Sequence, residues 1–123
     1  MTRRLRIAVA DDERDVREYF EKILPRLGHD VVAVASSGAE LVEACRRTQP
    51  DLVITDIKMP DMDGLEAVRM LRAERPIPVI VVTGYQDRAY SDRARNEAVR
   101  VYLVKPVKGT DLEAALALLA GEI

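Results

Sequence analysis

The sequence predicts an α/β domain built on a parallel β-sheet. Short apolar runs alternate five times with segments whose apolar residues recur at helical spacing, a pattern typical of repeated βα units. Several of these runs are unbroken, as in strands that a parallel sheet buries on both faces. The 123 residues have the length of one domain. A chain of this size buries roughly two thirds of its unfolded surface.

The composition narrows the functional classes. The chain is 48% hydrophobic and 33% charged, and its net charge of −2 gives no basic excess for nucleic acid or for an anionic membrane. The single Cys45 excludes an internal disulfide and a multi-cysteine metal site. The basic N-terminus precedes only a strand-length apolar run, so we expect no signal peptide and no membrane span. We therefore expect a cytoplasmic protein with no direct nucleic-acid or membrane partner.

The first strand and helix are predicted directly from this pattern. Residues 5–10 form a run that is apolar except for Arg6, and apolar residues between 16 and 27 recur on one helical face. Pro25 lies inside that pattern, where a missing backbone donor should bend or fray the last turn. Gly28 suits the end of the helix. His29 begins the next turn, and we interpret it as an exposed turn residue.

The next elements lie between residues 31 and 56. A strand is predicted at 31–35, and a helix then begins at Ser37, which has capping-box spacing to Glu40. Cys45 lies on the apolar face of this helix, where a small buried side chain is its ordinary role. The third strand, around 52–54, is an unbroken apolar run that ends at a carboxylate, Asp56.

The second half of the chain repeats the alternation. Asp63 and Gly64 precede a helix with apolar residues over 65–71, and a strand is predicted at 79–82. The helix expected at about 87–98 offers mostly alanines for burial, so we expect it to be the most mobile helix. The last strand is predicted at 101–104. The last helix opens with the capping box of residues 110–113, and its predicted inward face is Leu112, Ala115, Leu116 and Leu119.

Polar side chains stand directly after four of the predicted strands. Asp11 and Asp12 come after the first strand, Asp56 after the third, Thr83 after the fourth and Lys105 after the fifth. The carboxyl ends of parallel strands meet at one edge of a sheet, where ligands of open α/β folds bind. We therefore expect three carboxylates, a hydroxyl and an ammonium group to lie together.

This set of groups predicts magnesium-dependent phosphoryl chemistry. Crowded carboxylates repel one another, and Mg²⁺, which prefers oxygen ligands, relieves the repulsion. A chain with one histidine and one cysteine is poorly suited to zinc. One carboxylate can then attack phosphorus, with Lys105 and Thr83 contacting phosphoryl oxygens. Each residue alone has an ordinary explanation as solvated surface, but their shared position at strand ends favours a site.

Four stretches resemble motifs of one protein family over residues 5–120. They are 9–13 (VADDE), 51–60 (DLVITDIKMP) with 62–64 (MDG), 82–84 (VTG) and 102–106 (YLVKP). Together they resemble the receiver domain of bacterial two-component response regulators. The resemblance implies a flavodoxin-like, doubly wound (βα)5 fold of three α/β/α layers with strand order 2-1-3-4-5. We expect residues 1–123 to be a single receiver domain, with no output domain in this chain.

The resemblance also implies a cofactor and an acceptor. Asp56 would accept the phosphoryl group. Asp11 and Asp12 would hold Mg²⁺ directly or through water, and Asp56 and the backbone carbonyl of Lys58 would complete the protein ligands.

The same resemblance gives roles to the ends of the last two strands. Thr83 and Lys105 would contact the phosphoryl group, and Pro106 would come after a cis peptide bond. Thr83 and Tyr102 would be the switch residues. Without the resemblance, Tyr102 is interpreted as a partly buried strand aromatic with its hydroxyl in water. Gly84 departs from the alanine or serine frequent there.

The implied function is a phosphorylation-controlled signalling switch, which catalyses only its own phosphorylation and dephosphorylation. A sensor histidine kinase or phosphotransfer protein would supply the phosphoryl group. The helix at 87–98, the strand at 101–104 and the last helix would then contact an output partner or a second copy. Ala114, Ala117 and Leu118 form a small apolar surface on the outward side of that last helix.

Three alternatives stay open. A magnesium-dependent aspartyl-phosphate phosphohydrolase would place a second Asp two residues after the nucleophile, where this chain has Lys58. A flavin binder would cradle a phosphate in its first loop, where residues 11–13 would repel it. The third alternative is a receiver fragment of a longer transcription or antitermination regulator. The run at 105–107 and the start of the last helix bear a faint resemblance to such regulators.

Overall fold

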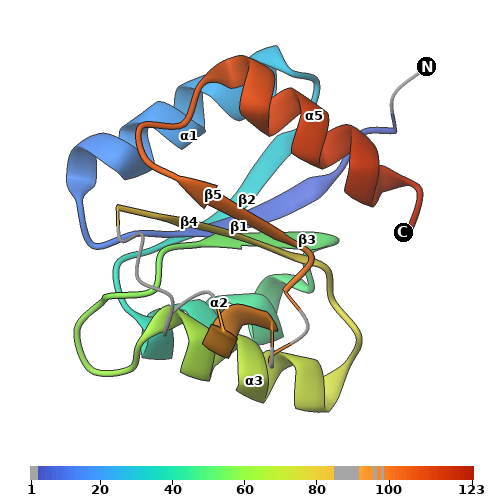
Figure 1. Cartoon of the computed structure of the whole chain (residues 1–123). Coiled ribbons are helices and arrows are strands. Elements are labelled where there is room, and N and C mark those ends of the chain that lie inside the picture. Colours follow the sequence, from blue (N-terminus) through green and yellow to red (C-terminus); the bar gives the residue numbers. More distant parts are fainter. Residues whose placement is uncertain (1–2, 85–91, 96, 98) are drawn as a thin grey trace.

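A computed structural model describes residues 3–84, 92–95, 97 and 99–123. Five parallel strands lie in the order β2-β1-β3-β4-β5, with α1 and α5 covering one face and α2 and α3 the other (Figure 1). The elements in chain order are β1 (Arg6–Ala10), α1 (Arg14–Arg26), β2 (Asp30–Ala35), α2 (Gly38–Thr48), β3 (Leu52–Thr55), α3 (Gly64–Glu74), β4 (Val79–Thr83), β5 (Val101–Val104) and α5 (Gly109–Ala120). The predicted three-layer fold and its strand order are confirmed.

The core divides into two clusters, one on each face of the sheet. Alternate residues of the central strands enter opposite clusters, as the two-residue period of a strand requires: Val53 enters one and Ile54 the other. All residues of β3 and β4 are buried, in agreement with their unbroken apolar sequences. Cys45 is a buried core residue, and the predicted inward face of α5 is buried throughout. The central strands are therefore a rigid base for the loops at their carboxyl ends.

Side chains accept hydrogen bonds from the backbone at the starts of α2, α3 and α5. Ser37 accepts a hydrogen bond from the backbone N–H of Glu40, which confirms the predicted start of α2. The predicted start of α5 is wrong by about two residues. Lys108 is the N-cap, and the Asp111 carboxylate accepts a hydrogen bond from its backbone N–H. This earlier start is favoured because Asp111 already stands three residues after Lys108.

His29 is not the exposed turn residue that its sequence position predicted. Its side chain is only 2% exposed, and its Nδ1 accepts a hydrogen bond of 3.0 Å from the backbone N–H of Leu5. Burial lowers the pKa of this imidazole, with a smaller opposing effect of the Asp30 carboxylate. Gly28, with φ at 91°, turns the chain so that His29 enters the base of the sheet.

The predicted helix at 87–98 is described only in part. Residues 92–95 are helical, and Ala94 is buried as predicted. The Arg93 guanidinium lies 3.0 Å from the carboxylate of Asp63, the N-cap of α3. Residues 85–91, 96 and 98 lie outside the described residues, so the expected mobility of this helix stays a prediction.

No helix in the described ranges combines the length and the apolar character that a bilayer span requires.

Candidate functional site

The register of the sheet brings the predicted site residues together. Ala10 of β1 pairs with Thr55 of β3, so Asp11 and Asp56 occupy neighbouring positions at the ends of adjacent strands. Thr83, at the end of β4, accepts a backbone hydrogen bond of 2.8 Å from Lys105 beyond β5. The carboxyl edge of the sheet therefore holds the acids, the hydroxyl and the ammonium group in one place, as the strand-end pattern predicted.

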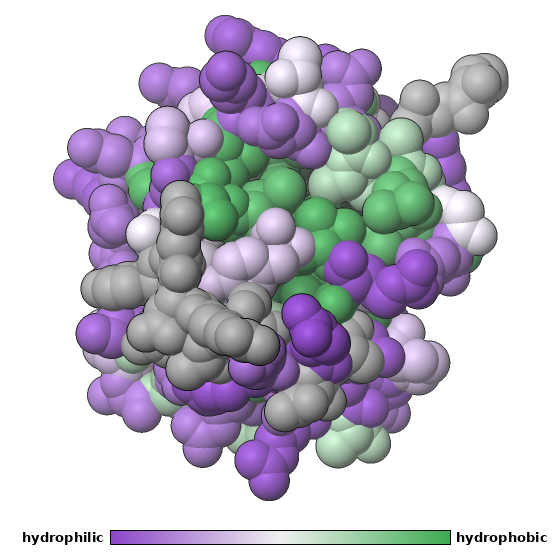
Figure 2. Space-filling view, viewed as in Figure 1, coloured by the Kyte–Doolittle hydropathy of each residue, from purple (hydrophilic) through white to green (hydrophobic). Residues whose placement is uncertain are grey.

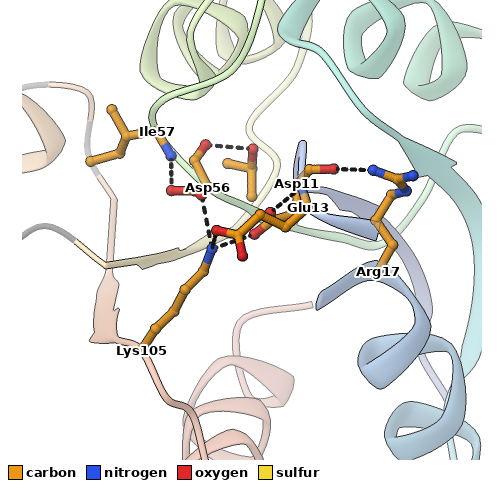
Figure 3. A network of polar contacts seen from close by, with 7 residues as sticks. Asp11, Glu13, Arg17, Asp56, Ile57 and Lys105 are labelled. Carbon is orange, nitrogen blue, oxygen red and sulfur yellow. Dashed lines mark hydrogen bonds and ion pairs between the residues drawn. The ribbon is translucent and has the colours of Figure 1, made fainter. Parts of the chain in front are cut away.

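The centre of the site is the Lys105 ammonium group. Its Nζ lies 2.8 Å from Asp11 Oδ2, 2.9 Å from Asp56 Oδ2 and 3.5 Å from Glu13 Oε1 (Figure 3). The side chains of Asp11 and Asp56 are 1% and 6% exposed, whereas that of Glu13 is 64% exposed. Sequence reasoning assigned Glu13 no role, although it is the third acid in an unbroken run after β1.

Burial and ion pairing set the protonation of these groups. Burial is the main reason that the pKa of Asp11 is raised, and the hydrogen bond from Lys105 opposes it. Burial by itself lowers the pKa of Lys105, but hydrogen bonds with Asp11 and Asp56 outweigh it and raise the pKa overall. Lys105 therefore stays an ammonium at neutral pH and neutralises part of the charge of the two buried carboxylates.

A backbone hydrogen bond orients the Asp56 carboxylate. Its Oδ1 accepts a hydrogen bond of 2.6 Å from the N–H of Ile57, which leaves Oδ2 facing Lys105. The Thr55 hydroxyl donates to the Asp56 carbonyl. Gly64 packs so closely that a Cβ built on it would lie 1.8 Å from the Asp56 carbonyl oxygen. A larger residue at 64 would therefore push the backbone at Asp56 out of place, and this close packing helps to fix the direction of Asp56.

The loop that carries Asp11 is held in a similar way. Asp11 Oδ1 accepts a hydrogen bond of 2.9 Å from the N–H of Glu13, which closes a tight turn. On the other side of the loop, Arg17 Nη1 donates to the Asp11 carbonyl at 2.9 Å (Figure 3). Sequence reasoning missed Arg17, because a contact with a backbone carbonyl leaves no motif.

The acidic cluster consists of Asp11, Asp12, Glu13 and Asp56. Each residue offers a carboxylate oxygen, and the four oxygens lie within 4.8 Å of one another. Asp12 is exposed, and it lines an open groove of about 400 Å³ with Lys58 and Asp56. Hard oxygen donors beside a water-accessible groove suit Mg²⁺, which keeps several of its waters. The residues present therefore fit the predicted cation.

The remaining predicted residues lie around this centre. Thr83 is fully buried, and the side chain of Lys58 is exposed beside the groove. Tyr102 is partly buried and packs against the core cluster on the α2–α3 face. The peptide bond between Lys105 and Pro106 is cis.

Comparison with known proteins agrees with this arrangement. Residues 7–117 match the family described as response regulator receiver domain. Two regulators of Mycobacterium tuberculosis are similar in sequence. The transcriptional regulatory protein PdtaR is 37% identical over 92% of this chain and 55% of its own length. The DNA-binding response regulator MtrA is 33% identical over 92% of this chain and 49% of its own. The chain spans about half the length of these relatives.

Solved structures give the same result. A response regulator receiver domain protein from Clostridium thermocellum superposes with a TM-score of 0.88 at 32% identity, covering 95% of this chain and 94% of that one. The signal receiver domain of the putative response regulator NarL from M. tuberculosis has a TM-score of 0.90 at 26% identity, covering 98% of both chains. With its motifs, fold and family match in agreement, the chain belongs to the response regulator receiver domain family.

Proposed function

We propose that this receiver domain is a phosphorylation-controlled switch in which Asp56 accepts a phosphoryl group in a magnesium-dependent reaction. The observation that carries the proposal is the position of the Lys105 ammonium between the buried carboxylates of Asp11 and Asp56. One carboxylate oxygen of Asp56 is held by the backbone and the other faces a charged, solvent-accessible edge. This is the arrangement that an oriented nucleophile requires.

The chemistry is built on the same contacts. We assign Asp11, Asp12, Asp56 and the Lys58 carbonyl as the ligands of Mg²⁺, which would neutralise charge on the phosphoryl oxygens. Asp56 Oδ2 forms the new bond to phosphorus while the bond from phosphorus to the donor breaks. The Ile57 N–H holds Asp56 Oδ1 and so keeps Oδ2 directed outward. Lys105 can then exchange its contact with Asp56 for a phosphoryl oxygen.

The donor is inferred from family membership and the output face from the surface. A sensor histidine kinase or a phosphotransfer protein would supply the phosphoryl group. An apolar band crosses the face that carries β5 and α5 (Figure 2). On α5, Leu118 is 60% exposed beside exposed Ala114 and Ala117. We propose that movement of Thr83 and Tyr102 after phosphorylation alters this face, which contacts an output partner or a second copy.

The acceptor is tested with Mg²⁺, a small acyl phosphate donor and intact-mass measurement. We expect one phosphoryl group that is stable in acid and labile in base. Asp56→Asn should remove it, because an amide is a poor nucleophile of nearly the same shape. Asp61→Asn is the matched control, since Asp61 is exposed in the next loop and asparagine tolerates its positive φ. Equal labelling of wild type and Asp56→Asn would refute the assignment.

The output face is tested separately with beryllofluoride, a phosphoryl mimic. Amide chemical shifts should change around Asp56 and also along β5 and α5. Leu118→Arg should weaken any self-association or partner binding that the mimic induces, and should leave labelling of Asp56 unchanged. Shift changes confined to the loops around Asp56, with residues 99–118 silent, would show that this face does not carry the output.

A further inference from the structure

We propose that α1 is a brace that sets the spacing between the acidic loop after β1 and the lysine loop after β5. Two of its side chains, Arg17 and Tyr19, act as positioning residues for the site. This inference rests on the proposed function, because it concerns how the Mg²⁺ and phosphoryl site is held in shape.

The two contacts reach both loops from one helix. Arg17 Nη1 donates a hydrogen bond of 2.9 Å to the carbonyl of Asp11. The Tyr19 hydroxyl donates a hydrogen bond of 2.9 Å to the carbonyl of Val107, two residues beyond Lys105. Both acceptors are backbone carbonyls, so each contact fixes the path of a loop and leaves the functional side chains free.

The helix itself is firmly anchored. Phe20 and Leu24 on its buried face are 2% and 0% exposed, and the rings of Tyr19 and Phe20 meet edge to face at 5.6 Å. At about 100° per residue, a rotation of about 200° separates positions 17 and 19, so their side chains point roughly 160° apart around the helix axis. Arg17 and Tyr19 therefore extend from opposite sides of an anchored helix. Arg17 reaches the acidic loop and Tyr19 reaches the lysine loop.

The spacing that α1 sets is the one the site depends on. Asp11 and Lys105 lie on the two braced loops, and their side chains are in contact at 2.8 Å. A cation that binds Asp11 and a phosphoryl oxygen that binds Lys105 must fit the same separation. Loss of either brace contact would let one loop drift, and the bound arrangement would become less favourable.

The charge of Arg17 makes the direction of the change in Mg²⁺ affinity a test of the proposal. Arg17→Met removes a positive charge beside an acidic cluster, and by charge alone this change makes Mg²⁺ bind more tightly. Loss of loop position makes Mg²⁺ bind more weakly. Tyr19→Phe removes one hydroxyl and changes no charge near neutral pH, so it reports on position alone.

The experiment first establishes that the wild-type protein binds Mg²⁺ and is labelled by a small acyl phosphate. Mg²⁺ alone is then titrated into wild type, Arg17→Met, Tyr19→Phe and the double variant, with the Ile57 amide shift as readout and thermal melting in parallel. Arg14→Met is the matched control, because Arg14 lies on the same helix in an exposed pair with Glu18.

We expect each single variant to weaken Mg²⁺ binding roughly three- to tenfold, the range that loss of one hydrogen bond gives. The fold loss of Mg²⁺ affinity in the double variant should be smaller than the product of the two single losses, because both contacts fix the same spacing between the loops. Arg14→Met should bind Mg²⁺ like wild type.

Unchanged Mg²⁺ affinity in Tyr19→Phe, tighter binding in Arg17→Met, or losses that multiply in full would overturn the brace. A lower melting point with unchanged affinity would also overturn it, because the contacts would then be structural only. A wild-type protein that binds Mg²⁺ yet is not labelled refutes the proposed function. If the wild type is labelled normally and the variants bind Mg²⁺ as tightly as it does, the brace is refuted and the proposed function is not.

Discussion

Replacing Lys105 with methionine removes an ammonium group that contacts three carboxylates and keeps the aliphatic bulk of the side chain. Two of those carboxylates, on Asp11 and Asp56, are almost fully buried. Without the ammonium they repel each other at the edge of the sheet, so Lys105→Met should be less stable than wild type when Mg²⁺ is absent.

The size of the effect depends on the burial. Removing one partner of a buried ion pair costs about 3–5 kcal/mol. The low end applies, because the site borders solvent and Asp11, whose pKa is already raised, can take up a proton. For a domain of this length, about 3 kcal/mol corresponds to a fall of roughly 10 °C in melting temperature. Mg²⁺ at 100 times its dissociation constant adds about 2.7 kcal/mol of stability, enough to restore most of the loss.

The assay is thermal melting with a chelator and with Mg²⁺, at two pH values. Lys105→Met should gain more from Mg²⁺ than wild type gains, because the cation no longer competes with the ammonium for Asp11. The stability deficit of Lys105→Met should be smaller at low pH, where Asp11 is protonated and uncharged. The deficit should grow as pH rises through the raised folded pKa of Asp11, because Asp11 then becomes charged. Lys108→Met, on the exposed part of the same loop, is the control. A variant as stable as wild type in chelator, or one with no extra gain from Mg²⁺, would refute this account.

Three further predictions concern the same region and the base of the sheet. Gly64→Ala should lower the free energy of unfolding by about 1–3 kcal/mol in denaturant titrations and slow labelling, because its Cβ would lie 1.8 Å from the Asp56 carbonyl oxygen; normal stability and labelling would contradict the close packing. Asp12→Ala should bind Mg²⁺ more weakly and melt no lower than wild type in chelator, because a repulsion is removed; a clearly lower metal-free melting point would count against crowded acids. The pKa of His29 is lowered by burial, so its contribution to stability is full above about pH 6.5 and is lost as pH falls toward the folded pKa. His29→Asn, whose amide oxygen can accept the Leu5 N–H without titrating, should flatten the dependence of melting temperature on pH between about 7.5 and 5; an equally steep curve would show that His29 does not set it.

The features that sequence predicted share one physical cause. Unbroken apolar runs in a βα repeat fix a parallel sheet, and a parallel sheet places every strand end at one edge. Asp11, Asp56, Thr83 and Lys105 could therefore be assigned to one edge before any coordinates, and the structure brings them together there. The type of each residue predicted the chemistry of the site, and its position directly after a strand predicted where in the fold it lies.

The features that sequence did not predict depend on backbone groups. His29 is buried because the N–H of Leu5, 24 residues away, needs an acceptor. Tyr19 bonds the carbonyl of Val107 across 88 residues. Every residue offers the same carbonyl and nearly every residue the same N–H, so no residue type marks the partner.

The charge of the site argues for an order of binding. The acidic cluster has four carboxylates, and the Lys105 ammonium group contacts three of them, so these five groups have an excess of three negative charges when all are ionised. A phosphoryl donor that approaches this cluster is repelled, whereas Mg²⁺ is attracted. With Mg²⁺ in the cluster, this excess would fall to one negative charge, and the cation would share with the Lys105 ammonium the neutralisation of Asp11. The cation would therefore lower the barrier to the donor and would also release Lys105 to contact a phosphoryl oxygen, so we expect Mg²⁺ to bind before the phosphoryl group is transferred.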